Sequence, residues 1–247
     1  MPPLKDLKEI LEIPRIYEEE SWHSPGGRAL REVVFGINDG IVSTVGFLLG
    51  IAGVFASRRM CLVSGLAEVL AGAVSMFFGG YLSTKSQQEF FENEIQREKR
   101  EIEEMPAKER EEIRRIYRSK GFSDEKELDL VVQRITADKR IWLKCMMEEE
   151  LGLILESMNS PLKVGFLIGA SFLVGGFIPL IPLVFFETHL AVKTSVLFTA
   201  AILFFLGALK TTLTRQSWIK SGLETLLIGI VAAGIGLVIG FLLKGVM

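Results

Sequence analysis

Two carboxylates stand alone inside long apolar stretches of this sequence. Asp39 is the only charged residue of Val33–Ala56, and Glu68 is the only charged residue of Met60–Thr84. A carboxylate inside a membrane span costs about 3 kcal/mol, so it normally faces a polar pathway or a partner. Met76 follows Glu68 by about two helical turns and therefore shares its helix face. Asp39, Glu68 and Met76 are candidates for one transport pathway.

These three side chains together favour metal ions of intermediate hardness. Carboxylate oxygens suit hard and borderline divalent ions, whereas thioether sulfur suits softer ones. The mixture favours Fe²⁺ or a neighbouring first-row metal over Mg²⁺ and Ca²⁺. Alternatives stay open for each residue. They are a structural hydrogen bond from Asp39 to Asn38, Ser43 or nearby backbone, ordinary packing for Met76, and proton handling or a structural partner for Glu68.

A second group of candidate ligands lies in segment 85–163, which contains 16 Lys or Arg and 19 Asp or Glu residues. Helical residues three or four apart share a face. The candidates with this spacing are Glu98 and Glu101, Glu109 and Glu112, and Met146, Met147 and Glu150. Three such faces could surround cations with carboxylates and sulfur. Because ligating carboxylates must be deprotonated, the expected affinity falls as pH drops toward ordinary carboxylate pKa values of about 4–5.

The alternative for this segment is a solvated surface laced with salt bridges. Other acids of the segment have equally acidic surroundings in the sequence: Glu103, Glu104, Glu111, Glu148 and Glu149. Spacing by itself therefore favours an ordinary charged surface over a metal centre.

Composition indicates which elements position these residues. The 247 residues are 49% apolar and 23% charged, with a mean hydropathy of +0.36, so charge and apolar residues must be segregated. Five apolar blocks of about 20–25 residues can each cross a hydrocarbon core of about 30 Å. They are Val33–Ala56, Met60–Thr84, Val164–Phe186, Leu190–Leu209 and Ile219–Leu243. The expected fold class is all-α: a polytopic membrane protein with five transmembrane helices and an inserted three-helix cytosolic domain.

Helix signals divide the inserted segment into three predicted helices. The first continues from the second span to about Met105 and stops at Pro106, which cannot continue a helix interior. The second covers about 107–119 and stops at Gly121. The third runs from Asp124, a good N-cap, to about Ser157. The predicted organisation is an N-terminal arm over 1–32, spans over 33–84, a helical metal-binding domain over 85–160 and further spans over 161–247.

Basic residues and glycines add predictions about orientation and assembly. If the N-terminal arm and segment 85–163 share one side, that side holds 24 of the 28 Lys and Arg residues. The positive-inside rule then makes this side cytosolic. Glycines four residues apart let helix backbones approach closely, which fits a helix dimer and packing within one chain equally. These pairs are Gly36/Gly40, Gly46/Gly50 and Gly165/Gly169.

Scarce residue types disfavour several function classes. His23 and His189 are the only histidines, which argues against a catalytic zinc site and against the Glu-x-x-His pairs of a di-iron enzyme. Cys61 and Cys145 fall on opposite sides of the membrane in the predicted topology, so they cannot pair. The sequence contains no phosphate-binding glycine loop, so it gives no support for ATP-driven pumping. The net charge of −2 gives no support for nucleic-acid binding. We therefore do not expect an enzyme.

Several motifs resemble the vacuolar iron transporter family, in the type that carries a cytosolic metal-binding domain. They are Arg31–Gly40, Ala67–Met76, Gly80–Ser86, Trp142–Leu153 and Gly175–Pro182. The resemblance covers about residues 28–243. It implies a dimer of five-span subunits that exchanges cytosolic Fe²⁺ for protons and tolerates other divalent metals such as Mn²⁺, Co²⁺ and Zn²⁺.

The resemblance also implies site residues and partners. By position, the metal-binding side chains of the domain are Glu98, Glu101, Glu109, Glu112, Met146, Met147 and Glu150, and the membrane pathway is Asp39, Met76 and Glu68. No permanently bound cofactor is expected, because the metal is the substrate. The expected partners are divalent metal ions, protons, the lipid bilayer and a second copy of the chain, without nucleic acid. A plasma membrane and a vacuole-type membrane fit equally.

Two rival functions accompany this hypothesis. The first is a transporter of the same fold that carries chiefly Mn²⁺. The second is a membrane-anchored iron buffer or sensor whose helical domain binds iron without translocation. Asp39 argues against the second rival, because a membrane anchor has no use for a carboxylate inside a span.

Overall fold

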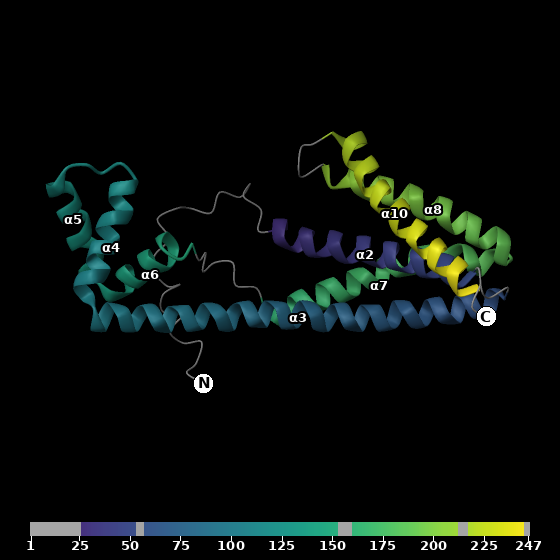
Figure 1. Cartoon of the computed structure of the whole chain (residues 1–247), viewed down its shortest axis with the longest axis horizontal. Helices are drawn as coiled ribbons and strands as arrows, with labels where there is room; N and C mark the ends of the chain where they lie inside the picture. Colours follow the sequence, from purple (N-terminus) through teal and green to yellow (C-terminus); the bar gives the residue numbers. More distant parts are fainter. Residues whose placement is uncertain (1–25, 53–56, 153–159, 212–216, 245–247) are drawn as a thin grey trace. The chain divides into compact units, whose positions relative to one another are not determined.

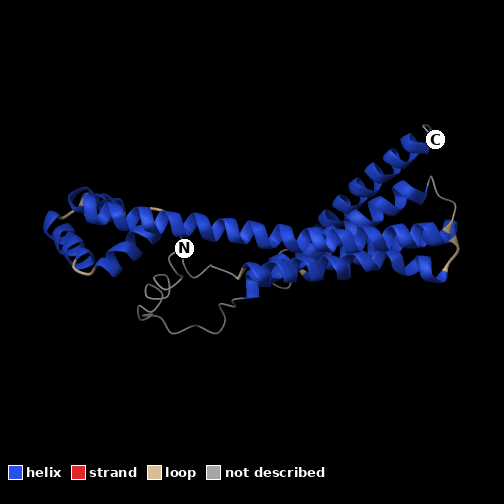
Figure 2. Cartoon of the chain, turned by 90° about the horizontal axis from the view of Figure 1, so that it is seen from below, coloured by secondary structure: helices blue, strands red, loops and turns tan. Residues whose placement is uncertain are grey.

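The computed structural model describes residues 26–52, 57–152, 160–211 and 217–244, and every regular element within them is an α-helix (Figures 1 and 2). In chain order the helices are α2 (Gly26–Ala52), α3 (Arg58–Glu104), α4 (Pro106–Ser119), α5 (Glu125–Thr136), α6 (Lys139–Glu149), α7 (Pro161–Phe185), α8 (Thr188–Leu209) and α10 (Trp218–Lys244). The helices form two compact units. We call Ser24–Ser83 with Ser160–Met247 the bundle, and Thr84–Asn159 the inserted domain.

Within the part of the chain that the structure describes, five helices are long and apolar enough to cross a membrane, as predicted. They are α2, α3, α7, α8 and α10. Large apolar side chains cover the outside of the bundle, among them Leu70, Phe78, Leu197, Phe205 and Phe241. An apolar exterior of this kind is what a helical bundle presents to lipid.

The first helix begins earlier than the sequence predicted. Residues 26–32, assigned to the N-terminal arm, belong to α2. The reason is local, because residues 28–32 (Arg-Ala-Leu-Arg-Glu) are good helix formers and no breaker separates them from the apolar span. Residues 1–25 of the predicted arm lie outside the described part of the chain.

Close contacts between helix backbones hold the bundle together. All three glycine pairs found in the sequence pack within the chain: Gly36/Gly40 against α7, Gly46/Gly50 against α10, and Gly165/Gly169 against α3. A methyl group added at Gly40 would lie 2.2 Å from the carbonyl oxygen of Phe172. Of the two interpretations that glycine spacing left open, the structure favours packing within one chain for these pairs.

The inserted domain begins on α3 and continues through α4, α5 and α6. Helix α3 ends at Glu104, close to the predicted stop at Pro106, and α4 begins at Pro106, one residue before the predicted start. Gly121 follows α4 with a φ of 102°, a conformation that glycine adopts without strain. The Asp124 carboxylate accepts hydrogen bonds from the backbone N–H groups of Lys126 and Glu127, so it caps α5 as predicted.

The prediction of one long third helix was wrong. The chain leaves the helix after Thr136, and Asp138 caps the start of α6. The Asp138 carboxylate accepts a hydrogen bond from the backbone N–H of Arg140. Aspartate favours such caps because its short side chain reaches the unpaired N–H groups of a first turn. Helix α6 ends at Glu149, earlier than Ser157, which lies outside the described residues. The inserted segment therefore has α4, α5 and α6 in addition to the end of α3.

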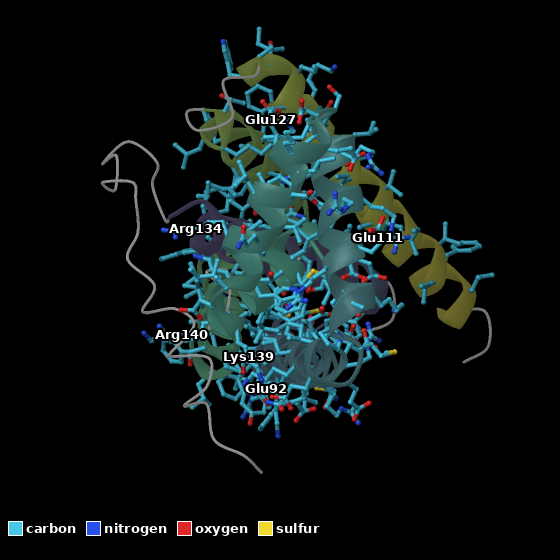
Figure 3. All side chains as sticks on the ribbon, turned by 90° about the vertical axis from the view of Figure 1, so that its left-hand side faces the viewer. Glu92, Glu111, Glu127, Arg134, Lys139 and Arg140 are labelled. Carbon is cyan, nitrogen blue, oxygen red and sulfur yellow. The ribbon has the colours of Figure 1, made fainter. Side chains whose placement is uncertain are left out.

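A compact apolar core lies inside the inserted domain. Its buried residues are Ile95, Ile102, Ile113, Val132, Trp142, Leu143, Met146 and Met147. Many charged residues of this domain lie on its outside instead, as Figure 3 shows for Glu111, Glu127, Lys139 and Arg140. This core holds α3, α4, α5 and α6 together, and it includes both methionines that the sequence proposed as ligands.

Candidate metal centre

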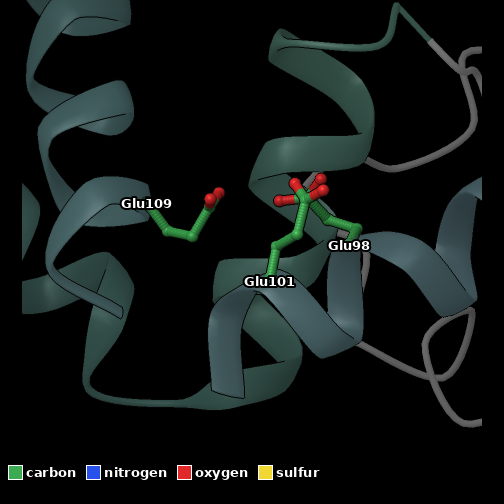
Figure 4. A group of neighbouring side chains, drawn as sticks. All are labelled: Glu98, Glu101 and Glu109. Atoms are coloured by element: carbon green, nitrogen blue, oxygen red, sulfur yellow. The ribbon is translucent and has the colours of Figure 1, made fainter. Parts of the chain in front are cut away.

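All five glutamates that the sequence predicted as ligands come together in the inserted domain. Glu98, Glu101 and Glu109 each offer a carboxylate oxygen within 4.8 Å of the others, and Figure 4 shows their carboxylates pointing toward one another. Glu109, Glu112 and Glu150 form a second group by the same criterion. Glu109 belongs to both groups, so the five carboxylates form one continuous acidic cluster.

Local helix structure explains how these side chains meet. Glu98 and Glu101 share a face of the last turns of α3, and Glu109 and Glu112 share a face of the first turns of α4. The break at Met105 lets α4 leave the axis of α3, so that Glu109 faces Glu98 and Glu101 (Figure 4). Glu150 caps the end of α6, where its backbone N–H donates to the carbonyl of Met146 at 2.9 Å.

Two members of the acidic cluster are buried, and three of their four carboxylate oxygens lack a hydrogen-bond partner within the described residues. Glu98 is 1% exposed and Glu109 is 0% exposed. Within the described residues, Oε1 of Glu98 and both carboxylate oxygens of Glu109 accept no hydrogen bond. Burying such acceptors is costly unless a proton, a donor or a metal ion compensates. The arrangement therefore fits a site that exchanges protons for a cation.

Burial and mutual repulsion raise the pKa values of these acids. The pKa of Glu98 rises from 4.5 to about 8, chiefly because of burial and then because of the nearby Glu150 and Glu109 carboxylates. Burial followed by the charge of Glu112 also raises the pKa of Glu109 and of Glu150. The raised pKa of Glu98 predicts that metal affinity already falls as pH drops below about 8, earlier than the expected fall toward pH 4–5.

Most of the acids that competed with the acidic cluster in the sequence have a different setting. Glu103, Glu111, Glu148 and Glu149 form ion pairs with Lys139, Arg114, Lys144 and Lys120, respectively. All four of these glutamates are exposed. They form the solvated, salt-bridged surface that the sequence offered as the alternative, and the acidic cluster is distinct from it.

The two methionines lie in the core of the inserted domain. Met146 and Met147 are both 0% exposed and pack with apolar residues of α3, α4 and α5. Packing in this core explains their burial without any bound metal. Their role as sulfur ligands stays a prediction from the family resemblance.

Helices α2 and α3 bring two carboxylates together in the bundle. The hydroxyl of Thr44 on α2 donates a 2.8 Å hydrogen bond to Oε2 of Glu68 on α3. Asp39 lies close enough to Glu68 for the two carboxylates to interact electrostatically. Met76 is half-buried on α3, two turns beyond Glu68. Sequence reasoning missed Thr44, although a hydroxyl five residues after Asp39 in an apolar span was a usable signal.

The alternative structural role of Asp39 receives no support from its surroundings. Within the described residues the Asp39 carboxylate accepts no hydrogen bond, and the Ser43 hydroxyl donates to the Gly40 carbonyl at 3.4 Å instead. Asp39 is nevertheless half-buried. A half-buried carboxylate without a protein donor fits a residue that binds a transported ion or a proton.

Thiol chemistry does not fit the inserted domain. Sγ of Cys145 lies 4.0 Å from the hydroxyl of Tyr117, and burial raises the pKa of this thiol above its ordinary value. Burial also raises the pKa of Tyr117, to about 12. Both groups therefore stay protonated near neutral pH, where only a thiolate would act as a strong ligand or nucleophile.

Known proteins resemble this chain over most of its length. The model of the VIT family matches residues 30–241. Vacuolar iron transporter 2 of Oryza sativa subsp. japonica is 36% identical over 217 residues, which cover 87% of this chain and 88% of that protein. Vacuolar iron transporter 1 of Arabidopsis thaliana is 34% identical over 212 residues, or 85% and 84% of the two chains.

A more distant organism supplies a similar match. The vacuolar iron transporter of Plasmodium falciparum (isolate 3D7) is 34% identical over 224 residues, which cover 87% of this chain and 82% of that protein. The resemblance drawn from sequence motifs is thereby confirmed. The chain belongs to the VIT family.

Proposed function

We propose that this multi-pass membrane protein moves Fe²⁺ out of the cytosol in exchange for protons. The observation that carries the proposal is the acidic cluster, in which three carboxylate oxygens of the buried Glu98 and Glu109 lack a hydrogen-bond partner within the described residues. A divalent cation would satisfy these oxygens and relieve the repulsion between them. Relatives named vacuolar iron transporters support iron as the substrate.

Ligand chemistry supports a first-row transition metal. An all-carboxylate site accepts Mg²⁺ and Mn²⁺ as readily as Fe²⁺, and sulfur from Met146 or Met147 would shift preference toward Fe²⁺, Co²⁺ and Zn²⁺. Both methionines lie in the core formed by the helices that carry the acidic cluster. We expect Fe²⁺ as the main substrate, with Mn²⁺, Co²⁺ and Zn²⁺ as weaker ones.

The carboxylates of the bundle supply a route for translocation. Asp39 and Glu68 are the candidate ion-binding groups, and Thr44 holds one of them in place. In a low-dielectric setting two neighbouring carboxylates are not both stable as free anions, so at least one must hold a proton or the two must share a metal ion. A site that holds either a metal ion or protons, but not both, is the minimum requirement for exchange.

Orientation and assembly complete the proposal. The bias of Lys and Arg supports a cytosolic position for the inserted domain. We propose a homodimer that uses α3, because the glycine pairs of the other helices are engaged within the chain. Exposed small residues recur every four positions on the membrane part of α3, at Ala67, Ala71, Ser75 and Gly79. Ala71→Leu should then shift the detergent-solubilised protein from dimer to monomer, whereas Ala170→Leu on the exposed face of α7 should not.

The proposed exchange is tested in proteoliposomes that contain the full chain. Uptake of Fe²⁺ under reducing conditions should accelerate when the lumen is more acidic than the bath, and a luminal pH dye should report proton loss during uptake. Metal uptake that ignores the imposed gradient would contradict proton exchange. Tight metal binding without any uptake would favour the rival function, a membrane-anchored iron buffer or sensor.

A further inference from the structure

One basic side chain contacts the acidic cluster at its central member. Nζ of Lys108 lies 3.7 Å from Oε1 of Glu109 and 3.5 Å from Oε1 of Glu112. Glu109 is the carboxylate that both three-member groups share. An ammonium at this position therefore faces the oxygens that an ion in either group would use.

Two other cations contact outer members of the acidic cluster. Arg97 lies 3.8 Å from Glu101, and Arg115 lies 3.3 Å from Glu112. Within the described residues neither of them contacts the buried carboxylates of Glu98 or Glu109. Lys108 is thus a cation placed to compete with a bound metal ion, because it contacts the carboxylate that both groups share.

Lys108 and Glu112 have the i,i+4 spacing of an ordinary helix pair, but the place of Lys108 in the first turn is otherwise unfavourable. Lys108 is the third residue of α4, and its backbone N–H donates to the carbonyl of Met105 in the first turn. The N-terminus of a helix carries a partial positive charge, so acids stabilise a first turn and a lysine there is unfavourable. Its ion pairs with the acidic cluster compensate for this unfavourable position.

We propose that Lys108 is an intrinsic competitor, whose ammonium occupies the Glu109–Glu112 side of the acidic cluster until a divalent ion displaces it. This inference rests on the proposed metal-binding function of the cluster. Half of the Lys108 side chain is exposed, at 54%, so the ammonium can move into water on its flexible stem when the metal arrives. A monovalent ion gains too little from the same oxygens to displace it, whereas a divalent ion gains about twice as much.

The competitor has a consequence for transport. A site of five carboxylates without a competing cation would hold its metal tightly and release it slowly. Lys108 lowers the affinity and offers a replacement charge as the ion leaves, so the dissociation rate rises. It is a positioning residue for ion release and not a ligand of the metal.

The test compares Co²⁺ binding by variants of the full chain in detergent, using calorimetry for affinity and stopped-flow chelation for dissociation. Lys108→Met keeps the stem and removes the charge, and we expect it to bind Co²⁺ about fivefold tighter and to release it more slowly. Lys108→Arg keeps the charge and should stay close to wild type. Lys139→Met is the matched control, because Lys139 pairs with Glu103 outside the acidic cluster and its loss should leave Co²⁺ affinity unchanged.

The outcomes separate the inference from the function on which it rests. Wild-type protein that binds no Co²⁺ would contradict the proposed metal centre, and the competitor with it. Wild-type protein that binds Co²⁺ while Lys108→Met binds with equal or lower affinity would overturn the competitor alone. Equal tightening by Lys139→Met would also overturn it, because the effect would then come from net charge.

Discussion

The protein holds carboxylates in two settings, which differ in the number of carboxylates and in the polar side chains around them. The inserted domain gathers five glutamates from α3, α4 and the end of α6, with basic side chains around them. The bundle places only Asp39 and Glu68 together, and the Thr44 hydroxyl is the donor for one of them. The first setting suits capture of divalent ions from water, and the second suits passage of one ion at a time.

The packing around the carboxylates also differs between the bundle and the inserted domain. In the bundle, helix backbones approach so closely that a methyl group at Gly175 would lie 2.2 Å from the carbonyl oxygen of Ile37. In the inserted domain, long glutamate side chains meet at a break between two helices (Figure 4). Long side chains can adjust to ions of different size, whereas a closely packed bundle selects by position. The comparison teaches that affinity and translocation are separate properties, which different variants should remove.

The largest expected effect on metal binding comes from Glu98→Gln combined with Glu109→Gln. Loss of both buried carboxylates should weaken Co²⁺ binding at least about 100-fold, because the central ligands are gone. The thermal stability of the metal-free protein should stay the same or rise at neutral pH, because buried acids without partners are removed. Calorimetry and thermal scans of the full chain measure both.

The control for this variant uses acids outside the acidic cluster. Glu103→Gln combined with Glu111→Gln removes the same charge from exposed, ion-paired positions and should leave Co²⁺ affinity near wild type. Comparable losses in both double variants would show that the acidic cluster is an ordinary charged surface.

The pH dependence of binding should be the next largest effect. Below pH 8 Glu98 holds a proton that the metal must displace, so Co²⁺ affinity should fall about tenfold per pH unit for each proton released. Calorimetry in buffers of different ionisation enthalpy counts these protons. Affinity that stays constant between pH 6 and 8, with no proton release, would contradict metal–proton exchange at the acidic cluster.

The same pKa shift sets the direction of the stability change. The pKa of Glu98 is raised from 4.5 to about 8 by folding, so its proton stabilises the metal-free fold. This contribution is fully present below about pH 4.5 and is lost as pH rises through about 8. The melting temperature of metal-free protein should therefore fall over that range, and Glu98→Gln should reduce the fall.

A smaller effect is expected from the methionines. Alanine at Met146 and Met147 would open cavities that cost about 2–5 kcal/mol each, so it would confuse packing with ligation. Leucine conserves the volume at a cost below about 1.5 kcal/mol. If sulfur contacts the metal, Met146→Leu combined with Met147→Leu should weaken Co²⁺ binding severalfold and leave Mg²⁺ binding unchanged. Equal binding of Co²⁺ before and after would assign both methionines to packing.

Much of this architecture follows from simple sequence signals. Long apolar blocks predict the spans because a bilayer demands about 20 apolar residues per helix. Pro106 and Asp124 mark helix boundaries through local hydrogen bonding, which the sequence displays directly. The break at Asp138 escaped prediction because no Gly or Pro marks the end of α5, although Asp138 is itself a capping residue.

The acidic cluster was only partly predictable. Helical spacing placed Glu98 beside Glu101 and Glu109 beside Glu112, but it gave equal weight to exposed acids such as Glu111. Burial distinguishes Glu98 and Glu109 from exposed acids such as Glu111, and this burial depends on how α4 and α6 pack beside α3. The Thr44 contact joins two helices that are distant in sequence, and the Lys108 contacts lie within the first turns of α4. The sequence analysis identified neither Thr44 nor Lys108 as a partner of these carboxylates.

The most direct test of separate capture and translocation is to measure uptake and binding on one variant, Asp39→Asn. We predict that its Co²⁺ affinity in detergent matches wild type, because the acidic cluster is intact, while metal uptake into acid-loaded proteoliposomes and the accompanying proton loss both disappear. Glu187→Gln, an exposed acid between α7 and α8, should transport normally as the matched control. Normal uptake by Asp39→Asn, or loss of binding together with uptake, would contradict the account.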